Sequence, residues 1–436
     1  MSVVRRLLDK KYKVRGTIRS LADEQKVGQL KRRFPDLELF EADLLGGSEA
    51  FEKAMTGCGY VIHTASPFQL SVEDPQKDLI DPALKGTEAV MTAAVKAGVT
   101  RVVLTSSMAA CGPPQGWIED PSTVDKEKVF CEDDWNDTSS LTAGPYRYSK
   151  YLAEKKAWEI ADGAENLSLA VMLPSFVIGP MMSEHKDAES IKFIKGMLDG
   201  TKKADGCKGS AMGVVDVRDL SLAHVVAMES EEAGGKRFVL SSETGYPPIE
   251  LAGMLRDSFK AYPVPTEGAD PPFVPKYNHA RAAKILGFKP TPVERSLRDM
   301  ANAAIRLGIV ERKVLLRPAE FWKVADIQPD SKGANLIVKV VSLGASEEGK
   351  GGKQVQEVVV GDDSGIATMR LVGDEIAKME VGKVVEVRNS SVQMLKGYVR
   401  LLVGKWGKIS PHTGDTAPTP NMEKDISATE YELVVA

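Results

Sequence analysis

The chain has 436 residues, which is more than one ordinary hydrophobic core needs and suggests two domains or one large α/β domain with an appendage. With 43% hydrophobic and 27% charged residues, a net charge of −4 and no apolar run near eighteen residues, the composition predicts a globular protein without a membrane span, and no basic excess indicates nucleic acid. The four cysteines are widely separated and form no CxxC pair, so no disulfide framework or zinc site is indicated and a reducing, cytoplasmic compartment is expected.

The first twenty residues, MSVVRRLLDKKYKVRGTIRS, predict a helix followed directly by a strand. Apolar residues recur at helical spacing between Val3 and Leu8, and the alternation from Tyr12 to Ile18 is typical of a strand. In an alternating α/β chain, a strand is expected ahead of such a helix.

From Lys13 to about Val310, short apolar runs alternate with amphipathic stretches. This alternation predicts an α/β domain in which helices cover both faces of a parallel sheet. The clearest strands are expected at 14–18, 37–42, 59–65, 100–107, 167–175 and 235–242, and the clearest crossover helices at 23–34, 82–98 and 148–162.

The pattern becomes all-β beyond residue 315. We expect a first domain over 1–312, a polar linker over 313–320 and a small domain over 321–410. Five strand-like stretches with glycine-containing turns suit a closed barrel, and the oligonucleotide/oligosaccharide-binding (OB) fold is one candidate. Pro, Thr and charged residues dominate the segment after it, so disorder is expected over 411–436.

Tyr146 and Lys150 are four residues apart on a predicted helix and therefore share one face. An ammonium group beside a phenol favours the phenolate and lowers the pKa of the tyrosine, which makes it a usable proton donor to a carbonyl. Ser106 and Ser107 follow a buried strand, at the edge where parallel sheets bind ligands. Taken alone, the Tyr-x-x-x-Lys spacing is also compatible with chance, and the serine pair with a plain strand-end turn.

Nine segments, in order along the chain, resemble the extended short-chain dehydrogenase/reductases of the NAD-dependent epimerase/dehydratase family. The likeness is greatest to the group of dihydroflavonol, cinnamoyl-CoA and aldehyde reductases, and it covers nearly all of residues 2–312. It implies a Rossmann-type doubly wound parallel sheet and an oxidoreductase that transfers hydride from a nicotinamide to a small-molecule aldehyde or ketone. GPYRYSK replaces the NWYCYGK of true cinnamoyl-CoA reductases, so acyl-CoA reduction is not favoured. The segments are VRGTIRS, EADL, VIHTASP, KGTEAV, VVLTSS, YxxSKxxAEKxAW, LPSxVIGP, VDVRDLSLAHV and KILGFKPTPVERSLRD.

By that resemblance, Ser107, Tyr146 and Lys150 are the expected catalytic residues. Tyr146 would protonate the carbonyl oxygen, Lys150 would lower its pKa and hold the nicotinamide ribose, and Ser107 would hydrogen-bond the substrate. The resemblance also implies cofactor contacts from Asp43 and Leu44 beside the adenine, from His63, Ala65 and Ser66 beside the diphosphate and ribose, and from Pro174 beside the nicotinamide.

Arg19 follows the strand after which NAD enzymes of this fold often carry an acidic residue for the ribose 2′-hydroxyl. An arginine suits a 2′-phosphate instead, and the group uses NADPH with an arginine at this place. Arg19, helped by Lys26, therefore predicts NADP(H) as the cofactor. The alternative is a solvated surface arginine.

Members of the group begin with a strand and a G-x-x-G-x-x-[G/A/S] loop, and the first helix of this sequence corresponds to the element that follows the loop. Backbone amides of that loop and the helix N-terminus hold the pyrophosphate. Two interpretations follow: the sequence lacks roughly fifteen residues of a longer chain, or it is a degenerate relative that no longer turns over. In both, the strands that flank the absent central strand are expected to expose unpaired edges.

From Trp322 to Ser410 the chain resembles simple single-strand-binding proteins with one OB barrel. Such barrels stack bases on aromatic side chains along a basic groove. In the sensor-type proteins those aromatics stand where this chain has Val372, Leu395 and Leu402, so that platform is missing. The residues left to form a groove are Arg370, Arg388, Lys396, Tyr398, Arg400, Lys405 and Trp406.

Two functions for this barrel stay open, binding of single-stranded DNA or RNA and binding of a protein partner. The alternative to an active reductase is thus a single-strand-binding protein, possible also in the nucleus, whose reductase-like part is an inactive scaffold.

Overall fold

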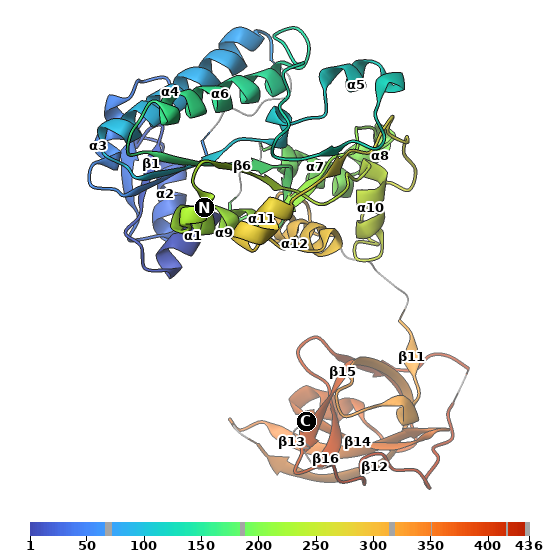
Figure 1. Cartoon of the computed structure of the whole chain (residues 1–436). Coiled ribbons are helices and arrows are strands. Elements are labelled where there is room, and N and C mark those ends of the chain that lie inside the picture. The colour runs from blue at the N-terminus through green and yellow to red at the C-terminus, as the bar shows by residue number, and fades with distance from the viewer. Residues whose placement is uncertain (66–71, 184–187, 314–318, 350, 416, 432–436) are drawn as a thin grey trace. The chain divides into compact units, whose positions relative to one another are not determined.

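The computed structural model describes residues 1–65, 72–183, 188–313, 319–349, 351–415 and 417–431 (Figure 1). The chain divides into two compact units, Met1–Leu315 and Leu316–Ala436. Among the described residues, no helix is both long and apolar enough to cross a membrane.

A parallel sheet in two parts forms the centre of the first unit (Figure 1). Buried, near-continuous apolar runs form its main part, as expected of strands covered on both faces. Four strands pair in the order β3 (Tyr60–His63), β4 (Arg101–Thr105), β6 (Ser168–Pro174) and β9 (Lys236–Leu240). The other part contains β1 (Arg15–Ile18) and β2 (Glu38–Glu41).

Helices lie on both faces of the sheet, and alternate residues of β4 show the two sides. Val102 packs into a core with α4 (Asp81–Lys96) and α6 (Pro145–Asp162), which lie side by side (Figure 1). Val103 packs into the opposite core with α1 (Ser2–Asp9), α9 (Val217–Glu229) and α11 (Ala280–Leu286). The doubly wound α/β architecture predicted from the sequence is therefore confirmed.

A third core of the first unit lies beyond the carboxyl ends of the strands. Its members come from helices and a short parallel strand pair: α7 (Glu189–Asp199), α10 (Pro248–Arg256), α12 (Val293–Arg306), β7 (Phe176–Ile178) and β8 (Val214–Asp216). The remaining elements are α2 (Glu24–Arg33), α3 (Glu49–Met55), α5 (Gln115–Glu119), α8 (Thr201–Ala204) and the pair β5 (Val129–Phe130) with β10 (Lys276–Tyr277).

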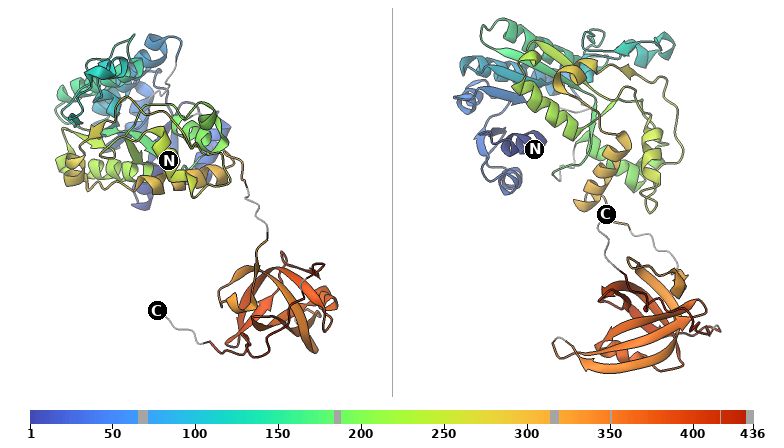
Figure 2. Two further views of the ribbon diagram at one scale, coloured as in Figure 1. Left: turned by 90° about the vertical axis from the view of Figure 1, so that its right-hand side faces the viewer. Right: turned by 60° about the horizontal axis from the view of Figure 1, so that its bottom comes forward.

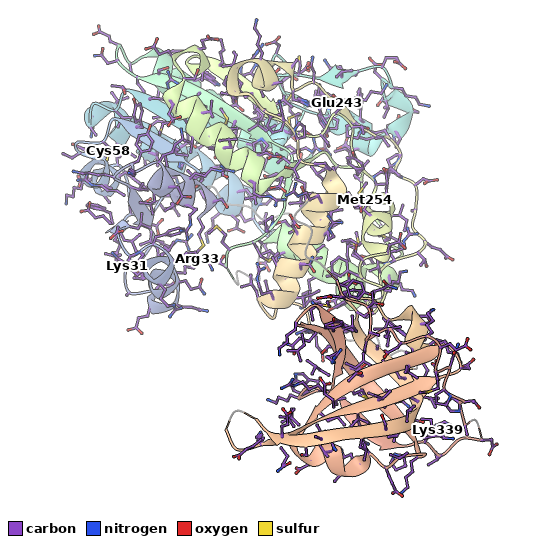
Figure 3. The ribbon with its side chains drawn as sticks, turned by 90° about the horizontal axis from the view of Figure 1, so that it is seen from below. Lys31, Arg33, Cys58, Glu243, Met254 and Lys339 are labelled. Carbon is purple, nitrogen blue, oxygen red and sulfur yellow. The ribbon has the colours of Figure 1, made fainter. Side chains whose placement is uncertain are left out.

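The two parts of the sheet are separated where the sequence predicts unpaired edges. Within the described residues, β1 pairs only with β2, and β3 only with β4. A cavity of about 1470 Å³ lies between them and is lined by both strands. Cys58, another residue of its lining, is labelled in Figure 3.

The second unit is a closed barrel of antiparallel and parallel strands (Figure 2). Its first strand pairs with both the second and the fourth, and its third strand pairs in parallel with the fifth, which is the connectivity expected of an OB fold. These five are β12 (Lys332–Glu348), β13 (Gln354–Asp362), β14 (Gly365–Val372), β15 (Val384–Leu395) and β16 (Tyr398–Leu402). Two short strands, β11 (Phe321–Trp322) and β17 (Lys408–Pro411), pair with β12 and β15.

Described residues between 421 and 431 bond to the barrel, so the disorder predicted over 411–436 is wrong for those residues. The backbone N–H of Ile366 donates to Lys424 and that of Tyr431 donates to Gly397, while Ser427 Oγ accepts from the N–H of Thr368. Ile426 also packs against the barrel core. Composition missed this because the segment pairs with a strand edge that only the folded barrel presents.

Candidate active site and nucleic-acid surface

Ser107, Tyr146 and Lys150 come together at the carboxyl end of β4. Ser107 caps a short 3-10 turn there, with its Oγ accepting from the N–H of Ala109 at 3.1 Å. The side chains of Ser107 and Tyr146 share a hydrogen bond, and Lys150 Nζ lies 5.7 Å from the centre of the Tyr146 ring. The structure brings the three predicted residues together; their catalytic roles stay a prediction.

The start of α6 explains how this pair is placed. Gly144 has φ +75°, a left-handed conformation that suits glycine, and Pro145 follows at the first helical position. The helix therefore begins just ahead of Tyr146, and Lys150 lies one turn later on its buried face.

Burial dominates the electrostatics of the pair. It raises the pKa of Tyr146 to about 12, against the hydrogen bond from Ser107 and the charge of Arg147, which both lower it. Burial also lowers the pKa of Lys150 to about 8. The sequence predicts that the ammonium of Lys150 lowers the pKa of Tyr146. In the chain by itself the pKa of Tyr146 is raised instead, because desolvation of the phenolate is the larger effect. Tyr146 is protonated at neutral pH.

His63 lies at the carboxyl end of β3, between this cluster and the cavity. It is 7% exposed and lines the cavity. Burial first, and the charge of Lys150 second, lower its pKa to about 4, so the imidazole is neutral at pH 7. His63 therefore adds no positive charge beside Lys150.

The other predicted cofactor residues occupy different settings. Arg19 follows β1 with its side chain 84% exposed, and its Nε lies 3.8 Å from Asp43 Oδ2. Leu44 packs against Gly86 of α4. Ala65 lines the cavity, Pro174 is buried at the end of β6, and Ser66 lies outside the described residues.

A buried ion pair near the cluster of Ser107, Tyr146 and Lys150 was not identified from the sequence. Glu154, on α6, accepts from Arg237 Nε at 2.7 Å and from Ser106 Oγ at 2.6 Å. Arg237 Nη1 donates to the carbonyl oxygens of Glu132 and Asp134, and its guanidinium lies 3.6 Å from the Trp135 ring centre. The only signal in the sequence is an acidic residue on the helix face that also carries Lys150, since Arg237 is far away along the chain.

A second buried group, His224 of α9, was also missed. Its Nδ1 donates to the carbonyl of Leu220 at 2.8 Å, so its Nε2 accepts from the hydroxyl of Thr105 at 2.6 Å. Burial lowers the pKa of His224 to about 4. This contact connects α9 to the end of β4, close in sequence to Ser107.

The structure divides the predicted nucleic-acid residues into two sets. The first set lies on β14, on β16 and in the turn before β16, and contains Arg370, Lys396, Tyr398 and Arg400. Glu430, after the barrel, forms a β-bridge to Tyr398. Arg400 is held by Glu357 at 3.0 Å and by the carbonyl of Ser427. The second set contains Arg388, Lys405 and Trp406, of which Trp406 is 81% exposed.

Comparison with known proteins agrees with both parts of this architecture. Residues 327–411 match the family described as single-stranded DNA binding protein Ssb-like, OB fold, and residues 2–241 match the NAD dependent epimerase/dehydratase family. Among solved structures, methylglyoxal/isovaleraldehyde reductase Gre2 of yeast, complexed with NADPH, matches with a TM-score of 0.61 and 26% identity over 70% of this chain and 95% of its own. Gre2 of Candida albicans, also in complex with NADPH, matches with a TM-score of 0.60 and 30% identity over the same shares.

Sequence relatives give the same result for the first unit. Cinnamoyl-CoA reductase CAD2 of Medicago truncatula is 36% identical over 310 residues, which are 69% of this chain and 90% of that protein. An anthocyanidin reductase of Vitis vinifera is 34% identical over 288 residues, 63% of this chain and 81% of that protein. From its divided Rossmann-type sheet, its assembled Ser-Tyr-Lys cluster and these matches, the chain belongs to the NAD dependent epimerase/dehydratase family.

Proposed function

We propose that the first unit is an NADP(H)-dependent reductase of an aldehyde or ketone carbonyl. The assembled cluster of Ser107, Tyr146 and Lys150 carries this proposal, because a protonated phenol, a hydroxyl and an ammonium group meet at the ligand-binding edge of a parallel sheet. The NADPH complexes among the similar structures and the reductases among the sequence relatives support it.

The residues present fit NADP(H) at its two ends. At the adenine end, Arg19 offers an exposed guanidinium beside Asp43, which suits a 2′-phosphate and a ribose. At the nicotinamide end, Lys150 and His63 are buried beside the catalytic hydroxyls. Residues 1–15 contain no glycine, so they supply no glycine loop for the pyrophosphate.

The chain's own residues account for the proton chemistry. The bound nicotinamide would supply the hydride. Ser107 and Tyr146 would both hydrogen-bond the carbonyl oxygen, and Tyr146 would donate its proton as negative charge develops there. Lys150 would favour the resulting phenolate by its charge, which offsets the burial that keeps Tyr146 protonated beforehand.

The test uses the full chain. NADPH binding is measured by nucleotide fluorescence, and turnover by the loss of NADPH in the presence of small and aromatic aldehydes and ketones. We expect saturable binding and carbonyl-dependent oxidation, with Tyr146→Phe retaining the first and losing the second. Binding without oxidation on any carbonyl would reject the reductase and leave a cofactor-binding scaffold.

A second proposed function, binding of single-stranded nucleic acid, belongs to the barrel. Its support is the 81% exposed Trp406 beside Lys405, together with the match of residues 327–411 to the single-strand-binding family. Labelled single-stranded oligonucleotides titrated at two salt concentrations should bind more weakly at the higher one. Undetectable or salt-independent binding would favour a protein partner for the barrel instead.

A further inference from the structure

We propose that single-stranded DNA binds the barrel across one surface, formed by Phe321, Arg388, Lys405, Trp406 and Lys408 and here called the Trp406 surface. The inference rests on the single-strand binding proposed above and adds where the strand lies. It places the DNA away from the side of the barrel that carries Arg370, Tyr398 and Arg400.

Strand pairing makes the Trp406 surface continuous. Arg388 of β15 and Lys408 of β17 are opposite each other in register. The guanidinium of Arg388 lies 4.5 Å from the ring centre of Phe321, on β11. Asn389 connects β12 to the segment that carries Trp406. Its N–H donates to Asn335 Oδ1 at 3.0 Å, and its Nδ2 donates to the carbonyl of Trp406 at 3.1 Å.

The side chains of this surface match the chemistry of an unpaired strand. Trp406 is 81% exposed, so a base can reach its ring, and Phe321 is 38% exposed with the Arg388 guanidinium over one face of its ring. Lys405 Nζ lies 5.2 Å from the Trp406 ring centre, which places a cation for a phosphate beside a stacking platform. Two acidic residues are neighbours: Glu386, which pairs with Arg388 at 2.8 Å and also contacts His412, and Glu320, which precedes Phe321. Three cations against these two carboxylates leave an excess of positive charge.

The part of the barrel formed by β14 and β16 is less suited to a strand. Arg400 has its side chain 18% exposed and held by Glu357 and by the carbonyl of Ser427. The backbone of 430–431 bonds to the start of β16. The exposed apolar residue at the end of β14 is Val372, which offers no ring for stacking.

The first experiment tests the stacking residue in the full chain with a fluorescently labelled oligo-dT. Replacing Trp406 by alanine removes one aromatic platform while its backbone carbonyl stays, so binding should weaken roughly 5- to 150-fold. Trp406→Phe should recover part of the loss. Val372→Ala, an exposed apolar truncation at the end of β14, is the matched control and should leave binding unchanged.

The second experiment tests the phosphate contacts. Three cations that contact the phosphates of a single strand predict a slope of about −2 for the logarithm of the binding constant against the logarithm of salt concentration. Lys408→Gln should make that slope shallower by about 0.7, whereas Arg370→Gln, the matched charge removal, should not change it. Thermal melts confirm that each variant is folded.

The outcomes separate this inference from the function on which it rests. If the unaltered chain binds no oligo-dT, single-strand binding fails and the Trp406 surface with it. If it binds, but Arg370→Gln weakens binding and Trp406→Ala does not, single-strand binding stands and the Trp406 surface is wrong. Equal affinity for a duplex of the same length would also overturn it, because paired bases are not free to stack on a ring.

Discussion

Ser107 and Tyr146 share a hydrogen bond in a site where burial is the largest influence on the pKa of Tyr146 and on that of Lys150. A phenol that stays protonated is a donor, and in the proposed reduction its hydroxyl partner and nearby ammonium would allow it to give up the proton. The proposed chemistry therefore depends on contacts of single side chains.

Ser107→Ala should lower kcat by roughly 10²- to 10⁴-fold with a smaller change in KM, since the serine assists proton donation more than substrate binding. The alkaline limit of activity should not move, because Lys150 loses its charge near pH 8, well below the pKa of Tyr146, which is about 12. A pH profile of kcat under saturating NADPH tests both expectations. An unchanged kcat would remove Ser107 from the catalytic cluster.

Arg19→Gln should weaken NADPH binding roughly 10- to 100-fold and leave NADH binding nearly unchanged, because one charge-assisted contact to the 2′-phosphate is lost. The residue is mostly exposed, so the fold should not change. Parallel fluorescence titrations with the two nucleotides make the comparison, with Lys96→Gln, at the exposed end of α4, as the control for a general loss of positive charge. An equal loss for both nucleotides would mean that Arg19 does not read the phosphate.

His224 should make the first unit sensitive to acid. Its pKa is about 4 in the fold against 6.5 in the unfolded chain, so between these values the unfolded chain binds more protons. The free energy of unfolding therefore rises with pH from about 4 to 6.5 and is flat above, with a total contribution of roughly 3 kcal/mol.

Urea unfolding at pH 4.5 to 7, followed by helical circular dichroism, measures this slope. His224→Gln should make it shallower, although His63, whose pKa is shifted in the same direction, should keep part of it. If the variant keeps the same slope, a group other than His224 causes the acid sensitivity.

At the scale of elements, α6 is positioned by a charge that it buries. Glu154 connects this helix to β9 through Arg237 and to the end of β4 through Ser106, so the helix is attached to the sheet one turn after Lys150. Burying two charges is costly, and leaving one of them alone costs more.

Arg237→Met should therefore lower the free energy of unfolding by about 3–5 kcal/mol, because it leaves the Glu154 carboxylate buried without its partner. Adding Glu154→Gln should recover much of this loss, since the amide can keep a hydrogen bond with Ser106 and carries no charge. The measurement is urea unfolding of both variants. A double variant no more stable than the single one would show that Arg237 acts through its carbonyl contacts instead.

At the scale of the whole molecule, two separate architectures share one chain, and the first has a divided sheet. The edges of β1 and β3 are both unpaired within the described residues, with a cavity of about 1470 Å³ between them. A parallel strand placed there would pair with both edges and bring a following loop to the carboxyl end of the sheet, where His63 lies.

A variant that carries a five-residue apolar strand and a G-x-x-G-x-x-G loop ahead of Met1 should bind NADPH at least tenfold more tightly and melt at a higher temperature. The reasons are the backbone amides offered to the pyrophosphate and the hydrogen bonds gained by both edges. The same extension with its glycines replaced by valines should gain stability but little affinity. Equal affinity in the two extensions would show that the loop does not hold the nucleotide.

Much of the fold could be predicted because it follows from local pattern. Each of the six apolar runs chosen as strands forms one, and the five strands of the barrel follow the glycine turns. The predicted disorder is wrong for the residues between 421 and 431 that bond to the barrel, because composition does not report a strand edge far away in sequence. The pairing of 366 with 424 exists only once the barrel has closed.

The sequence by itself determined the α/β and OB architectures, the family and which three residues, Ser107, Tyr146 and Lys150, form the candidate site, because periodicity and residue type act over short distances. Only the tertiary structure decided how buried these groups are, and hence that the pKa of Tyr146 is raised and that of Lys150 is lowered. It also decided that Arg237 is the partner of Glu154 and that Arg388 adjoins Phe321 and Lys408, while Arg400 is held by the barrel itself. Desolvation and long-range pairing depend on which segments meet, and no local pattern contains that information.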